Sequence, residues 1–158
     1  MRILVKPRRP CGLKKNNFFE RKSPPNVSNI IERRRNMTEK EFWQFMERSW
    51  NEKGRAAQIS GGIDSADPAL QAHGQHISGH ALLPNGYDEM SDEKILRIGE
   101  LLFDRKANPR TKEAIMVILA HIPSKVALSI LREYNARPDK GLEIFAEIAL
   151  DECEMWNE

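Results

Sequence analysis

The chain has 158 residues, 40% of them hydrophobic and 30% charged, with a formal net charge of +2, and this composition suits one globular domain with a hydrophobic core. No apolar run approaches the roughly 18 residues of a membrane span, and no secretory signal is visible, which argues against a membrane or exported protein. The two cysteines, Cys11 and Cys153, argue against a disulfide framework and favour the reducing cytoplasm.

Residues 1–36 are strongly basic, with 11 Lys and Arg against 2 Glu, whereas residues 37–158 hold 14 Lys and Arg against 21 Asp and Glu. The two segments therefore carry net charges of +9 and −7. Four prolines and the absence of a hydrophobic period predict that residues 1–36 form a disordered arm. Residues 37–158 are predicted to form a single helical domain.

Two interpretations of the arm remain open. It could bind nucleic acid, because the run Arg33 to Arg35 can neutralise phosphates while Phe18 and Phe19 stack on bases. Alternatively, it is an upstream extension whose translation is left open, since the capping sequence directly after Met37 makes that methionine resemble a natural start.

The first predicted helix covers residues 38–53. Thr38 and Glu41 form a capping box, in which each side chain accepts a hydrogen bond from the backbone of the other residue. Apolar side chains then recur at helical spacing and mark a buried face. They are Phe42, Phe45, Met46 and Trp50.

A long Gly-rich loop is predicted over residues 54–90, because six of the nine glycines lie between Gly54 and Gly86 without a sustained hydrophobic period. One turn of helix is expected at Asp67 to Ala72, where Asp67 can cap and Pro68 suits the first helical position. Loops of this length are uncommon unless they are functional or disordered.

Within this loop, the segment from Ser60 to Ser65 resembles the pyrophosphate-binding loop of the ATP pyrophosphatase family. The resemblance implies a phosphate-binding enzyme, with the ligand held by Ser60, Gly61, Gly62, Asp64 and Ser65. The context opposes this interpretation, because that family needs a parallel sheet and no strand is predicted in this chain.

The same loop holds three closely spaced histidines, His73, His76 and His80, which could bind zinc or nickel with Asp64 or Asp67 as an oxygen ligand. Glycines at positions 74 and 79 disfavour the helix that would align the three imidazoles. The metal site therefore remains an alternative, and no cofactor is predicted.

From Ser91 onward the pattern predicts four helices in succession. Ser91 caps the first, which ends near Arg105, and Asn108 with Pro109 opens the second, whose centre is apolar on every side and therefore buried. Pro123 opens the third, and the fourth follows Pro138 with a regular apolar stripe.

Proline recurs at a spacing of 29 residues between Pro109 and Pro138, and small or branched residues recur at matching offsets. With this pattern, residues 90–156 resemble the short HEAT-type repeats common in bacteria. The resemblance implies an all-α, antiparallel helical stack that acts as a scaffold for other proteins. The complete prediction is therefore an all-α domain with an N-terminal helix, a Gly-rich loop, a HEAT-like stack and a disordered basic arm.

The last predicted helix is acidic, which gives a candidate surface for an unknown protein partner, and its charge favours a basic one. The function predicted from the sequence is thus non-catalytic protein binding; nucleic acid would bind only if the arm is present. Trp43 and Trp156 are candidate anchors, while Cys153 lies on the apolar stripe and should be buried. The partner-binding residues predicted are Glu143, Glu147, Asp151 and Glu154.

Overall fold

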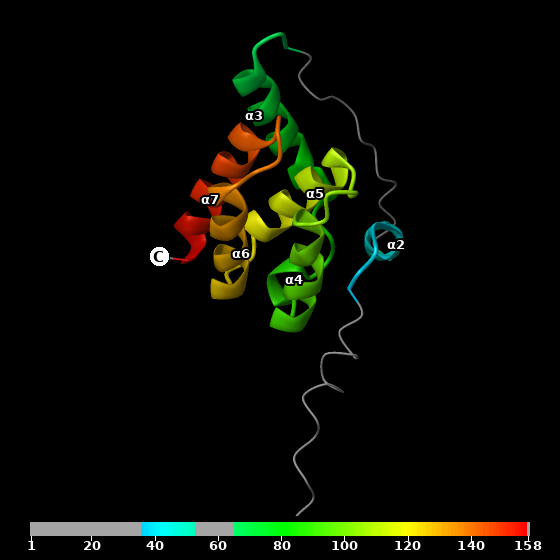
Figure 1. The fold of residues 1–158 in the computed structure, drawn as a ribbon. Helices are drawn as coiled ribbons and strands as arrows, with labels where there is room; N and C mark the ends of the chain where they lie inside the picture. Colours follow the sequence, from blue (N-terminus) through cyan, green and yellow to red (C-terminus); the bar gives the residue numbers. More distant parts are fainter. Residues whose placement is uncertain (1–35, 53–64, 158) are drawn as a thin grey trace, which may run out of the picture. The chain divides into compact units, whose positions relative to one another are not determined.

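The computed structural model describes residues 36–52 and 65–157, and within these ranges the chain is helical, with no strand (Figure 1). This confirms the predicted all-α class. The predictions for the basic arm and for Ser60 to Asp64 lie outside the described residues. The elements are α2 (Glu39–Asn51), α3 (Pro68–Gly79), η1 (His80–Leu82), η2 (Tyr87–Glu89), α4 (Asp92–Gly99), η3 (Glu100–Leu102), α5 (Pro109–Ala120), α6 (Lys125–Ala136) and α7 (Glu143–Asn157).

The predicted N-terminal caps are confirmed. Thr38 and Glu41 form both hydrogen bonds of the capping box at the start of α2. Ser91 accepts a hydrogen bond from the backbone of Lys94, and Asn108 caps α5 with Pro109 in its first turn. These helices begin where the sequence predicts because a cap depends only on residues within one turn.

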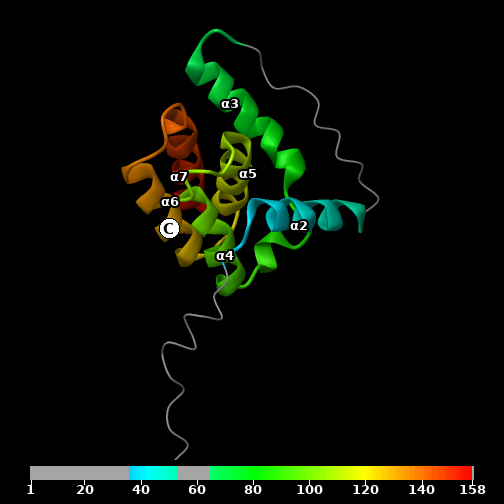
Figure 2. The same cartoon turned by 45° about the vertical axis from the view of Figure 1, so that its right-hand side comes forward.

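The centre of the domain is α5, which is buried on all sides from Ala114 to Ala120. Helices α3, α4, α6 and α7 all contact it, and Figures 1 and 2 show α6 and α7 beside it. Its apolar side chains therefore meet other helices rather than water, as predicted for a helix without a polar face. Cys153 of α7 is also fully buried, which confirms the prediction for this thiol.

Three helix boundaries differ from those predicted. Helix α4 ends at Gly99 and continues only as the 3-10 turn η3, so it is shorter than expected. Helix α6 begins at Lys125 because Ser124, rather than Pro123, provides the cap. Helix α7 begins only at Glu143. Gly141 has a φ of +88°, which is incompatible with a right-handed α-helix, so the helix cannot start at Pro138.

The prediction of a flexible loop over residues 54–90 is wrong for Pro68–Gly79, which form α3. The predicted cap at Asp67 is present, but the helix runs well beyond Ala72. A Cβ atom at Gly79 would lie 2.7 Å from Val117 Cγ2, so this glycine lets α3 pack closely against α5. Tertiary packing thus outweighs the helix propensity penalty of about 1 kcal/mol for each glycine.

Both tryptophans of α2 join this helix to the rest of the domain. The indole Nε1 of Trp43 donates to Thr111 Oγ1 at 2.9 Å, and that of Trp50 donates to the carbonyl of Leu82 at 3.1 Å. These bonds hold α2 against α5 and the segment after α3. Among the described helices, none has the length and hydropathy needed to cross a membrane.

Candidate functional site

An acidic ridge runs along α7. We use this name for Glu143, Glu147 and Asp151, which are exposed and spaced four residues apart, so that they lie in one row along the helix. Met155 continues the row and is 70% exposed. The ridge therefore combines negative charge with an apolar end.

The four acidic residues predicted to bind a partner differ in their surroundings. Glu154 accepts hydrogen bonds from Nε and Nη2 of Arg132, at 3.1 and 2.7 Å. Glu143 accepts one from the backbone of Gly141 at 2.7 Å. With respect to the described part of the chain, the carboxylates of Glu147 and Asp151 have no hydrogen bond or ion pair, so they are free to meet a partner.

Of the two tryptophans considered as anchors, Trp156 is the exposed one. This residue is 58% exposed on the last turn of α7, next to Met155. Trp43 is partly buried and its indole N–H is used by Thr111. An indole left exposed beside carboxylates is typical of the residues that dominate protein interfaces.

A second constellation lies where α3, α5 and α7 meet. We call it the His/Glu cluster, and it consists of His76, His80, His121 and Glu152. His76 Nε2 is 2.5 Å from Glu152 Oε2. The Nε2 atoms of His80 and His121 are 3.4 and 3.2 Å from the other carboxylate oxygen, Oε1. Three imidazoles thus surround one carboxylate.

In two of these rings, a backbone carbonyl determines that Nδ1 is a nitrogen that carries hydrogen. Nδ1 of His121 donates to the carbonyl of Val117 at 2.7 Å, and Nδ1 of His80 donates to that of Ile77 at 3.0 Å. A carbonyl oxygen only accepts, so both Nδ1 atoms carry hydrogen. The rings of His80 and His121 lie 4.4 Å apart and nearly perpendicular to each other.

Burial controls the ionisation of the most enclosed pair. The His76 side chain is 5% exposed, and burial lowers the pKa of His76 more than its hydrogen bond to Glu152 raises it. Burial also raises the pKa of Glu152, but the hydrogen bond from His76 and the neighbouring histidines outweigh this effect, so its pKa is lowered. A lowered pKa favours the uncharged form of His76, whose Nε2 then donates its hydrogen to the carboxylate of Glu152.

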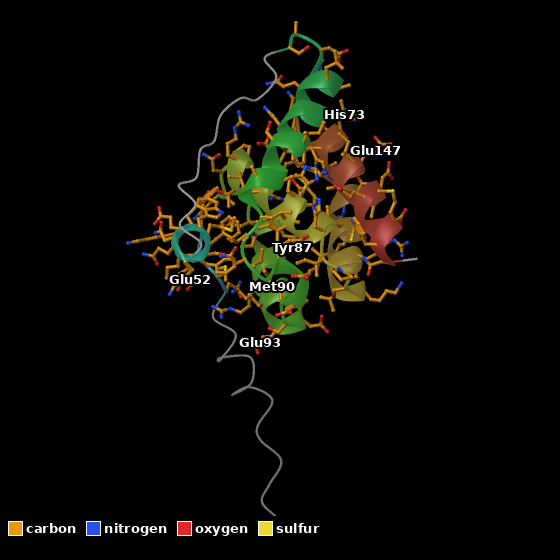
Figure 3. All side chains as sticks on the ribbon, turned by 180° about the vertical axis from the view of Figure 1, so that it is seen from behind. Glu52, His73, Tyr87, Met90, Glu93 and Glu147 are labelled. Carbon is orange, nitrogen blue, oxygen red and sulfur yellow. The ribbon has the colours of Figure 1, made fainter. Side chains whose placement is uncertain are left out.

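The structure brings together two of the three histidines singled out from the sequence. His73 instead is exposed, and its Nδ1 donates to the carbonyl of Ala69 at 2.8 Å, one turn earlier in α3. Figure 3 shows His73 on α3 and Glu147 on α7 as surface residues of two neighbouring helices. Asp67 is used as the cap of α3 rather than as a ligand.

Of the predicted phosphate-binding residues, only Ser65 falls within the described ranges. Its hydroxyl accepts a hydrogen bond from the backbone of Asp67 at 3.1 Å, so it takes part in the start of α3. The remaining residues of that motif lie outside the described chain. No observation in the described part of the molecule therefore favours phosphate binding.

Sequence reasoning missed His121 and Glu152 as members of the cluster. His121 forms the C-cap of α5. Glu152 is one of several acidic residues of α7. One feature of the sequence could have indicated Glu152. It directly precedes the buried Cys153, so its carboxylate lies at the edge of the apolar face of α7.

Comparison with protein-family models, with curated proteins and with solved structures found no match.

Proposed function

We propose that this chain is a non-catalytic, cytoplasmic protein-binding domain of HEAT-like type, which holds a basic segment of another protein against α7. The observation that carries the proposal is the acidic ridge, with its free Glu147 and Asp151 and its apolar end at Met155 and Trp156. Carboxylates attract and orient a basic segment, whereas exposed aromatic and thioether side chains supply the apolar contact.

The expected partner segment carries Lys or Arg at several positions and at least one large apolar side chain. Glu143, Glu147 and Asp151 repeat at each turn of α7, which suits positive charges that recur along a helix or an extended strand. Trp156, at 58% exposure, is the expected anchor for the apolar residue. This partner class differs from nucleic acid, whose phosphates the ridge would repel.

The test selects random peptides on the immobilised full chain and measures the affinity of the selected peptides by fluorescence anisotropy. We expect enrichment of Lys and Arg together with a large apolar residue. The double variant Glu147→Lys with Asp151→Lys should weaken binding at least about tenfold, because two attractive contacts become repulsive. Trp156→Ala should have an effect of similar size.

The matched control is the double variant Glu47→Lys with Glu133→Lys. Both residues are exposed, on α2 and α6, and the change in net charge is the same. Leu70→Ala, which truncates another exposed apolar side chain, is the control for Trp156→Ala. Equal losses in the ridge variant and its control, or selected peptides without basic residues, would contradict the proposal.

A further inference from the structure

We propose that the His/Glu cluster is a binding site for one divalent transition-metal ion, and that zinc fits it best. The ligands are His76, His80 and the carboxylate of Glu152, and Nε2 of His121 lies beside them, 3.2 Å from Glu152 Oε1. For His76 to bind through Nε2, the hydrogen that this atom donates to Glu152 must move to Nδ1, which has no hydrogen-bond partner among the described residues. This inference goes beyond partner binding at the acidic ridge and does not depend on it.

The first support is the orientation of lone pairs. Because Nδ1 of His80 and of His121 donates to a backbone carbonyl, each neutral ring has an unprotonated Nε2. Both Nε2 atoms lie within 3.4 Å of the same oxygen, Glu152 Oε1. When both rings are neutral, the Nε2 lone pairs of His80 and His121 point at the Glu152 carboxylate and are repelled by it. A cation bound between the two nitrogens and the carboxylate would be attracted by all of them.

The second support is distance. One ligand atom from each of His76, His80 and Glu152 can be chosen so that all three lie within 4.8 Å of one another. Zinc binds imidazole nitrogen and carboxylate oxygen at about 2.0 to 2.2 Å, so two of its ligands stand at most about 4 Å apart. Closing the site to that range requires side-chain rotation. His121 lies outside this group of three, but its Nε2 is 3.2 Å from Glu152 Oε1, so it is the residue placed to become a fourth ligand.

The third support is the set of contacts that hold the ligands in place. The two carbonyl acceptors, from Val117 and Ile77, orient the rings of His121 and His80 as outer partners do in natural metal sites. The ring of Phe145 packs edge-on against His76, with 5.3 Å between centroids. His80, with a side chain 39% exposed, gives the ion a path from solvent.

Ligand chemistry selects the metal. Three imidazoles and one carboxylate suit zinc and related transition ions, whereas calcium and magnesium require mainly oxygen ligands. With His121 as the fourth ligand, the protein would fill a tetrahedral site and leave no position for substrate, as in structural zinc sites. The ion would therefore join α3, the end of α5 and α7, and its function would be to stabilise their packing.

The experiment uses the full chain, first stripped with a chelator. Zinc affinity and stoichiometry are measured by competition with a chromophoric chelator, and cobalt is added separately so that its visible absorption reports the coordination geometry. We expect one ion per chain, a tetrahedral cobalt spectrum, and a rise in Tm of about 10 °C when free zinc is 100 times its Kd. Magnesium and calcium should not compete.

His80→Gln and Glu152→Gln should each weaken zinc binding at least about 100-fold, because they remove a ligand. His73→Gln is the matched control, since it changes a histidine of the same helix outside the cluster and should leave affinity unchanged. Circular dichroism checks that each variant retains its helices, and the exposure of His80 makes its variant the least disruptive.

Three results would overturn the proposal: no zinc bound at micromolar concentration, equal losses from His73→Gln and His80→Gln, or binding abolished by Cys11→Ser but not by Glu152→Gln. The proposal of partner binding at the acidic ridge and the proposal of zinc binding at the His/Glu cluster can each be refuted without affecting the other. His80→Gln should retain the peptides selected by the acidic ridge, and the charge-reversed ridge variant should retain zinc.

Discussion

Lys112 donates a hydrogen bond from its ammonium group to Oδ2 of Asp139, which lies 27 residues later in the chain. The lysine side chain is 3% exposed, and it also donates to the carbonyl of Leu102 at 2.8 Å. Tyr134 donates its hydroxyl to the same carboxylate oxygen of Asp139 at 2.9 Å. Asp139 thus neutralises a buried charge and joins α5 to the segment between α6 and α7.

Replacing Asp139 with Asn should lower the free energy of unfolding by about 2 kcal/mol at pH 7. Loss of one partner leaves the buried Lys112 charge uncompensated, and the 45% exposure of the Asp139 side chain keeps the loss below that of a fully buried pair. Urea unfolding measures the difference. Asp88→Asn, an exposed carboxylate in η2, is the control and should change stability little.

The same variant should have a pH-dependent effect. The hydrogen bond from Lys112 lowers the pKa of Asp139 below its usual value of 3.8. A lowered carboxyl pKa stabilises the fold above the unfolded-state value, and this stabilisation is lost as the pH falls through the folded-state pKa. The difference between wild type and Asp139→Asn should therefore be full above about pH 5 and should decrease as the pH falls through the folded-state pKa. A constant difference across this range would contradict the assignment.

Gly99→Ala should destabilise the domain by about 1 to 2 kcal/mol, although alanine is the better helix former. An added Cβ would lie 2.7 and 2.9 Å from two side-chain carbons of Ile130, where α4 meets α6. Thermal unfolding of both single variants and the double variant with Ile130→Ala gives the coupling energy. The isoleucine truncation should relieve the clash, so coupling of about 1 kcal/mol is expected. A stabilising Gly99→Ala would show that the helices can separate freely.

Ser49→Ala should cost about 1 to 2 kcal/mol by loosening α2. The Ser49 hydroxyl accepts a hydrogen bond from the backbone of Asn85 at 2.6 Å, and Ser49 is 6% exposed. Its loss leaves the backbone N–H of Asn85 without an acceptor. Urea unfolding measures the effect, with the exposed Ser129→Ala on α6 as the control. Equal stability of the two variants would show that this bond does not fix α2.

Cys153 should resist thiol reagents in the folded protein. Burial raises the pKa of this thiol from 9.0 to about 11, which lowers the thiolate fraction at pH 8 about 100-fold. The measurement is labelling with an aromatic disulfide reagent in a Cys11→Ser background, which leaves Cys153 as the sole thiol. Labelling should be at least about 100-fold slower than in urea-unfolded protein. Rapid labelling of the native chain would show that α7 opens readily.

The starts of most helices could be predicted because they depend on neighbouring residues. The capping box of Thr38 and the pairing of Asn108 with Pro109 lie within single turns. The burial of α5 followed equally from its continuous apolar run. Helix α3 could not be predicted in full, because its two glycines oppose a helix locally, and the close approach of Gly79 to Val117 exists only once α5 is in place.

Sequence alone thus determined the all-α class, the N-caps, the buried central helix and the acidic character of α7, since each depends on hydrogen bonds or periodicity within a few residues. Tertiary structure alone decided which histidines meet. His76 and Glu152 are 76 residues apart in the chain, and the packing of α3 against α7 brings them within 2.5 Å. It also separated His73 from the cluster and added His121, because the direction of a side chain depends on the position of its helix in the packed domain.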